Sequence, residues 1–141
     1  MLLCLDSSAL IKLLVEEDGS HVIARLWDDA DVLVASRLVV PEVAAALHAA
    51  RRNQRLDDDA LARALTAWAG YRPALRLVEL TSSLALQAAE LTVTSALSGA
   101  DAVHLASALT LKQASPLLAV WDRRLHAAAR AEGVRTAPAA L

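Results

Sequence analysis

The sequence has very little of the residue types on which several classes of protein depend. It contains one cysteine, Cys4, which excludes internal disulfides and a zinc site built on thiolates. Aromatic residues make up 3% of the chain and phenylalanine is absent, so there is no platform for reading unpaired bases by stacking. The formal net charge of −2 lacks the basic excess of a typical nucleic-acid binder. No apolar run approaches the roughly 18 to 20 residues of a membrane span.

The chain is long enough for one domain, which we expect to cover residues 1–141 and to bury roughly 70% of its unfolded surface. Its first apolar run ends at Asp6 after five residues, too short for a signal peptide. We therefore expect a cytoplasmic protein that does not contact a membrane. Cys4 lies inside that first apolar run, and we expect it to pack in the core.

Apolar runs alternate with helical patterns along the whole chain. Strands are expected at residues 2–5, 32–35, 75–80, 117–121 and 134–136. Helices are expected at 8–16, 20–29, 57–71, 81–97, 98–113 and 123–132. A further helix is expected after the strand at 32–35, ending at about residue 53. Strands that alternate with helices form a parallel sheet covered on both faces. The sequence therefore predicts an α/β fold.

Four acidic residues lie where strand-like runs give way to helices: Asp6, Glu42, Asp101 and Asp122. In an open α/β sheet, ligands bind outside the carboxyl ends of the strands. Carboxylates gathered there repel one another unless a hard divalent cation joins them. The pattern predicts a metal-dependent enzyme of phosphate chemistry.

Each of these acids also has a purely structural interpretation. Asp6 and Asp122 suit helix N-caps, because aspartate accepts hydrogen bonds from free backbone N–H groups at the positive end of a helix. Ser98 and Asp101 fit a capping box, and Glu42 suits the first turn of a helix. The remaining acids mostly lie in polar stretches, and we assign them no role.

Polar residues beside these acids have two interpretations as well. Ser7 and Ser8 are either helix caps or hydroxyls that hold a metal-bound water or a phosphate oxygen. Lys12 and Arg123 either meet a phosphate or lie on helix surfaces. We interpret Arg124 as a surface residue.

The four histidines give a weaker signal. His104 follows Asp101 on an apolar helix, and imidazole titrates near neutrality, so it is a candidate ligand or acid–base group. We favour a packed, hydrogen-bonded histidine. His21, His48 and His126 have no acidic or histidine partner at metal-ligand spacing, and we interpret them as surface residues.

Four stretches resemble the motifs of PIN-domain ribonucleases and, more narrowly, of VapC-type toxins of toxin–antitoxin pairs. They are, in order, LDSSALIKLLVEE, SRLVVPEVAAAL, LSGADAVHLASAL and WDRRL. The resemblance covers nearly the whole chain. It implies a single PIN-like domain with a five-stranded parallel sheet between helices. It also implies a homodimer, with a small VapB-type antitoxin wrapped over the active groove, and a tRNA or rRNA substrate.

The resemblance further implies roles for individual residues. The acids that match Asp6, Glu42, Asp101 and Asp122 hold one or two Mg²⁺ or Mn²⁺ ions in that family, and the hydroxyl that matches Ser8 supports the site. Where the family often has Thr or Ser two residues before the last acid, this chain has Val120. A hydroxyl that orients a water or Asp122 is therefore missing. We interpret the next residue, Trp121, as a core or interface residue.

The function predicted from the sequence is a metal-dependent endoribonuclease that acts as a toxin. The expected reaction is in-line attack of a metal-bound water on a phosphodiester, with a second ion about 3.5–4 Å away at the leaving oxygen. A housekeeping PIN nuclease and a catalytically weak interaction module on the same fold are the alternatives. A haloacid-dehalogenase-type phosphatase and a receiver domain are disfavoured, because Ser8 and Ser7 stand where those classes need an acid.

Overall fold

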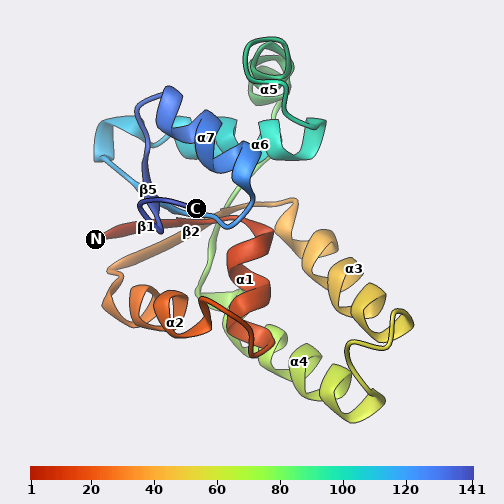
Figure 1. The fold of residues 1–141 in the computed structure, drawn as a ribbon. Helices are drawn as coiled ribbons and strands as arrows, with labels where there is room; N and C mark the ends of the chain where they lie inside the picture. Colours follow the sequence, from red (N-terminus) through yellow and green to blue (C-terminus); the bar gives the residue numbers. More distant parts are fainter.

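Five short strands form one fully parallel sheet at the centre of the molecule (Figure 1). The computed structural model describes all of residues 1–141. The strand order is β3-β2-β1-β4-β5, so the first strand is central. The strands are β1 (Leu2–Leu5), β2 (Val32–Ser36), β3 (Arg76–Val78), β4 (Leu117–Ala119) and β5 (Arg135–Ala137). The predicted α/β fold with a five-stranded parallel sheet is confirmed.

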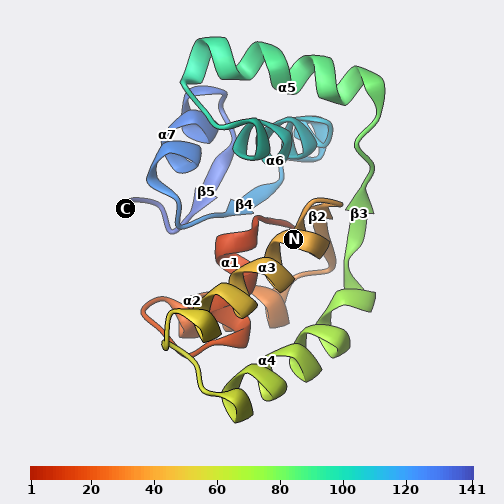
Figure 2. The ribbon, with the colours of Figure 1, turned by 90° about the vertical axis from the view of Figure 1, so that its right-hand side faces the viewer.

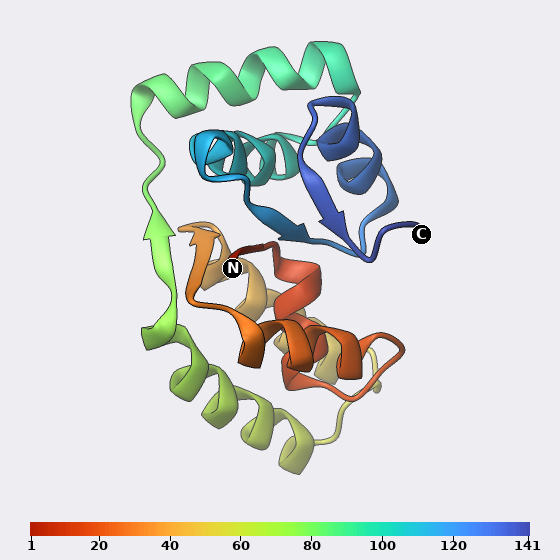
Figure 3. The ribbon, with the colours of Figure 1, turned by 90° about the vertical axis from the view of Figure 1, so that its left-hand side faces the viewer.

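Seven helices cover the two faces of this sheet. They are α1 (Ser7–Leu14), α2 (Ser20–Asp29), α3 (Val39–Arg52), α4 (Asp58–Tyr71), α5 (Ser82–Ser95), α6 (Gly99–Leu109) and α7 (Arg123–Ala131). Short 3₁₀ turns follow α4 (Arg72–Ala74) and α6 (Lys112–Ala114). Figures 2 and 3 show α1–α4 on one side and α5–α7 on the other, with α5 stacked outside α6. No helix is long and apolar enough to cross a membrane.

Successive residues of the central strands pack on opposite faces of the sheet. Leu3 and Leu5 belong to a core cluster with residues of α1–α4, whereas Cys4 belongs to a second cluster with residues of α5–α7. Leu118 and Ala119 of β4 divide between the same two clusters. Because side-chain direction alternates along a strand, both faces of the sheet are apolar and both are covered.

Cys4 packs in the core, as the sequence predicts. Its side chain is buried, and burial raises the pKa of the thiol to about 12. A thiol that stays protonated behaves as a small apolar side chain.

Several predicted elements are shorter in the structure than in the sequence pattern, among them the predicted helix 81–97, observed as Ser82–Ser95. The third strand ends at Val78 because Thr81 caps α5, accepting a hydrogen bond from the Leu84 N–H. The fourth strand ends at Ala119, since the backbone N–H of Trp121 turns away from the sheet to a side chain of α1. The predicted helix 98–113 ends at Leu109 and continues only as a 3₁₀ turn.

Candidate active site

The four predicted acids all lie at the N-terminal ends of helices. Asp6 is the N-cap of α1, and its Oδ1 accepts the Ala9 N–H at 2.9 Å. Asp122 is the N-cap of α7 and accepts the Leu125 N–H at 2.9 Å. Glu42 and Asp101 lie in the first turns of α3 and α6. The capping interpretation of Asp6 and Asp122 is thus correct, and the remaining contacts decide what else the acids do.

Asp6 is the most deeply buried of the four, with 4% of its surface exposed. The Ser8 hydroxyl lies 2.7 Å from its Oδ1 and 2.8 Å from its Oδ2. Burial raises the pKa of Asp6, and its hydrogen bonds with Ala9 and Ser8 and the charge of His104 oppose that rise. A buried carboxylate at the end of β1 is costly as an anion, which is the situation that a cation relieves.

Glu42 is held by two side chains from other parts of the chain. Nε2 of His104 lies 2.6 Å from its Oε2, and the Ser7 hydroxyl donates to the same oxygen. Oε1 has no hydrogen-bond partner within the chain. One oxygen of this carboxylate is therefore fixed, and the other is left for a ligand.

His104 hydrogen-bonds one of the four acids and is affected by the charges of two others. It is buried on α6, as predicted, and its hydrogen-bond partner is Glu42. Burial lowers its pKa, but the Glu42 hydrogen bond and the charges of Glu42, Asp6 and Asp101 outweigh burial and raise it overall. Burial likewise opposes ionisation of Glu42, but the hydrogen bonds from His104 and Ser7 prevail and lower that pKa. The sequence predicts a packed histidine but does not predict its place among the acids.

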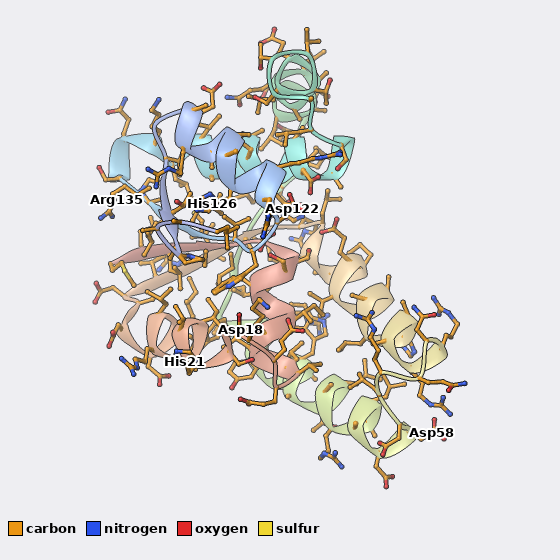
Figure 4. The ribbon with its side chains drawn as sticks, in the orientation of Figure 1. Asp18, His21, Asp58, Asp122, His126 and Arg135 are labelled. Carbon is orange, nitrogen blue, oxygen red and sulfur yellow. The ribbon has the colours of Figure 1, made fainter.

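Asp101 and Asp122 differ in how they join this group. Asp101 accepts the Ser98 hydroxyl at 2.7 Å, and its charge acts on His104 one turn further along α6. Asp122 is exposed and hydrogen-bonds only the backbone of its own helix. Figure 4 shows it at the start of α7, above α1, whereas Asp58 lies at the far end of α4. His104 hydrogen-bonds Glu42 and is affected by the charges of Asp6 and Asp101, whereas Asp122 stands outside this group.

A groove of about 530 Å³ opens beside Ser8 and Asp122 and runs between α1 and α3. Its walls are mostly apolar, with charged side chains along its length. Its lining residues are Ser8, Ile11, Lys12, Val15, Glu16, Glu17, Ala46, Leu47, Ala50, Arg55, Leu56, Trp121 and Asp122. The groove leads away from the acids toward the beginning of α4.

The donor set is of the type that a hard divalent cation binds, namely carboxylate and hydroxyl oxygens. No three Asp, Glu, His or Cys side chains of the chain are grouped closely enough to hold a metal ion directly. Mg²⁺ keeps several of its waters and commonly takes one or two carboxylates. The donors therefore fit such an ion, without all four carboxylates being direct ligands.

The structure excludes one of the two interpretations of Ser7 and Ser8 and corrects the interpretation of His126. Ser7 and Ser8 are not helix caps, because Asp6 caps α1 and both hydroxyls bond acids instead. His126 is not a surface residue, since it is buried and its Nε2 lies 2.9 Å from the Pro138 carbonyl oxygen. Its position on the inner face of the short helix α7 is the signal that could have shown this.

The remaining histidines and the basic residues near the acids lie on the surface or line the groove. His21 and His48 are exposed, as predicted, and so is Arg124. Arg123 is exposed as well. Lys12 lines the groove, where its Nζ bonds Glu17.

Comparisons with known proteins agree with this fold. The sequence profile of the PIN domain matches residues 3–131. Ribonuclease VapC45 and Ribonuclease VapC49, from two strains of Mycobacterium tuberculosis, are each 50% identical over 136 residues, which cover 96% of this chain and 94% of theirs.

Solved structures share the fold at low sequence identity. PAE2754 from Pyrobaculum aerophilum has a TM-score of 0.69 at 21% identity, covering 96% of this chain and 90% of that one. VapBC2 from Rickettsia felis, bound to a DNA fragment of its promoter, has a TM-score of 0.66 at 10% identity, covering 96% and 97%. The chain belongs to the PIN domain family and, within it, to the VapC ribonucleases.

Proposed function

We propose that the chain is an endoribonuclease that hydrolyses RNA phosphodiester bonds at the edge defined by Asp6, Glu42 and Asp101, with a divalent cation, Mg²⁺ or Mn²⁺, as cofactor. The observation that carries the proposal is that the adjacent serines at the carboxyl end of β1 hold two of these acids, Ser7 binding Glu42 and Ser8 binding Asp6, while His104 holds Glu42 from α6. Identity of 50% with proteins named ribonucleases supports the choice of RNA as the substrate.

Each residue of this site has a different role in the proposed reaction. A divalent cation bound there supplies an acidified water and neutralises charge on the phosphate. Ser8 orients the buried carboxylate of Asp6. His104 and Ser7 hold one oxygen of Glu42 and leave the other available. Asp122, which lines the groove, would help to hold a second ion or act on the leaving side of the substrate.

The partner we propose is a VapB-type antitoxin, and the chain is then the toxin of the pair. A relative named VapC at 50% identity and a structural neighbour solved as VapBC2 support this assignment. The groove between α1 and α3 has apolar and charged residues along it, and Ser8, the partner of Asp6, and Asp122 lie among its lining residues. A peptide segment lying there would cover Ser8 and Asp122. A homodimer, as the family resemblance implies, belongs to the same proposal.

The nuclease proposal is tested with purified protein and a structured RNA. The parent should cut the RNA with Mn²⁺ or Mg²⁺ and should stop in excess EDTA. Asp6→Asn should be inactive, whereas Asp28→Asn, which alters an exposed acid of α2, should cut at the parental rate. Circular dichroism checks that both variants fold. Cleavage by Asp6→Asn at the parental rate, or undiminished cleavage in EDTA, would overturn the proposal.

The toxin role is tested separately in growing cells. Expression of the parent should slow growth, and expression of Asp6→Ala at the same protein level should not. If a small protein is encoded beside this chain, its co-expression should restore growth and the two proteins should co-purify. Equal growth of cells expressing either form, together with metal-dependent cleavage by the purified parent, would favour a housekeeping nuclease on the same fold.

A further inference from the structure

Trp121 lies beside the acids but is neither an acid nor a hydroxyl, and the proposed reaction gives it no role. It connects β4 to α7 and is only partly buried. It lines the groove beside Ser8 and Asp122 and also a second hollow on its other side, next to Gly19. Its ring therefore separates two open spaces next to the site.

The indole of Trp121 lies directly against the backbone of Gly19. A Cβ atom added to Gly19 would stand 2.7 Å from Nε1 and 3.0 Å from Cε2 of the tryptophan. Such distances are shorter than van der Waals contact, so any side chain at position 19 would displace the ring. Gly19 also has φ of +89°, which side chains rarely adopt. Position 19 therefore requires glycine for two independent reasons.

The ring is covered a second time by Lys12. Its Nζ lies 5.4 Å from the ring centroid, within the range of a cation–π interaction. The same ammonium donates to Glu17 Oε1 at 2.9 Å and to the Asp18 carbonyl oxygen at 2.8 Å. Lys12 is therefore anchored to the loop between α1 and α2, and this loop holds the tryptophan through both Lys12 and Gly19.

The backbone of Trp121 is linked to Asp6 by hydrogen bonds through Ser8. Its N–H donates to the Ser8 hydroxyl oxygen at 2.9 Å, and Ser8 in turn donates to the Asp6 carboxylate. The next residue is Asp122, the cap of α7. Figure 4 labels Asp18 and Asp122, one in each of the two segments that the tryptophan joins. A shift of the ring would therefore move Asp122 together with the Trp121 N–H that hydrogen-bonds Ser8.

We propose that Trp121 is a positioning residue for the cleavage reaction. Seated on Gly19 and under Lys12, the ring fixes the turn between β4 and α7, so that Ser8 stays on Asp6 and Asp122 stays at the mouth of the groove. Val120, where a hydroxyl is expected from the family pattern, is fully buried in the core and cannot supply this restraint. The proposal rests on the proposed nuclease function.

The test compares Trp121→Ala, Trp121→Phe and Gly19→Ala in cleavage and in RNA binding. Positioning predicts that Trp121→Ala and Gly19→Ala lower kcat by between about tenfold and a hundredfold, since misplacement by about 1 Å has effects of that size. KM should stay near the parental value, and affinity for the same RNA in EDTA should be unchanged. Trp121→Phe, which keeps one aromatic ring, should lose less kcat than Trp121→Ala.

A double mutant separates the contact from general damage. The Cβ of Gly19→Ala collides with the indole only while the indole is present, so the part of its effect on kcat that the collision causes should be lost in the Trp121→Ala background. The part that the positive φ of Gly19 causes should remain in both backgrounds. Trp27→Phe, which alters the half-buried tryptophan packed on Tyr71, is the matched control and should cleave like the parent. Melting curves check that each variant is folded.

Each of the following results would overturn a different part of the proposal. Raised KM and weaker RNA binding in EDTA for Trp121→Ala, with Gly19→Ala unaffected, would overturn positioning in favour of a direct RNA contact. Fully additive losses from the two substitutions would show that Gly19→Ala acts through its backbone conformation alone and not through Trp121, which would overturn the role of this contact. Parental kcat in every variant would overturn this proposal alone, whereas a parent that does not cleave RNA would overturn the proposed function instead.

Discussion

Nε2 of His104 on α6 lies 2.6 Å from Oε2 of Glu42 on α3, and these two residues are 62 positions apart in the chain. The Ser7 hydroxyl donates to the same glutamate oxygen. The contact fixes the orientation of a candidate metal-binding carboxylate from outside its own helix. It also joins the two faces of the sheet, because α3 packs in one core cluster and α6 in the other.

Replacement of His104 should reduce both stability and cleavage. His104→Ala leaves the half-buried Glu42 carboxylate without its main partner, at a cost of about 1–3 kcal/mol in the free energy of unfolding. We expect kcat to fall by at least about tenfold. His104→Gln, whose amide can donate to Glu42, should recover much of both losses. Urea unfolding and cleavage assays measure this, with His48→Ala, an exposed residue of α3, as control. An alanine variant as active as the glutamine variant would contradict the expectation.

The same pair predicts how stability depends on pH in the absence of metal. The pKa of His104 is raised above 6.5, so its contribution is complete below that value and is lost as the pH rises through the folded-state pKa. The pKa of Glu42 is lowered below 4.5, so its contribution is present above 4.5 and is lost as the pH falls through its folded-state pKa. The melting temperature in EDTA should therefore fall on the alkaline side of pH 6.5.

His104→Gln provides the control for that pH dependence. Its amide does not titrate, so the alkaline decline in melting temperature should be smaller in the variant. The raised pKa of Asp6 has the opposite consequence to that of Glu42, because a buried carboxylate destabilises the fold once it ionises. Asp6 is present in both proteins, so the difference between their melting curves isolates the loss of the titrating His104. Parallel melting curves of parent and variant across the alkaline range would rule out the histidine as the cause.

Removal of one site charge should weaken stabilisation by metal. In EDTA, Asp101→Asn should melt near the parental temperature, because asparagine can still accept the Ser98 hydroxyl. With Mn²⁺ at a hundredfold excess over its Kd, the parent should gain roughly 2.7 kcal/mol, and the variant should gain much less. Asp28→Asn should gain as much as the parent. If Asp101 is only part of a capping box, Mn²⁺ will shift parent and variant alike.

Cys4 should be unreactive in the folded protein. It is buried between β2 and β4, and its thiol pKa of about 12 leaves almost no thiolate at neutral pH. A thiol reagent such as dithionitrobenzoate should label the native chain very slowly and the chain in guanidinium chloride rapidly and completely. The labelling rate in increasing denaturant should follow the unfolding transition. Rapid stoichiometric labelling under native conditions would show that β1 is accessible, contrary to the structure.

The sequence determined the features that depend on local order along the chain. Apolar runs of strand length, separated by helical patterns, are enough to predict a parallel sheet, because each run must bury both of its faces. The positions of Asp6 and Asp122 at the starts of helices follow in the same way, since aspartate is a preferred N-cap. Cys4 in the core also follows, because it lies in the middle of an apolar strand.

Contacts between distant segments were decided only by the tertiary structure. No local pattern distinguishes a histidine packed among apolar side chains from His104, which contacts a glutamate of another helix. Likewise, nothing near Gly19 in the sequence indicates that it contacts Trp121, which is 102 positions further along the chain. These pairs meet because the order β2-β1-β4 brings the ends of strands that are far apart in sequence to one edge. The sequence therefore determined which residue types were available to the site, and the strand order decided which of them touch.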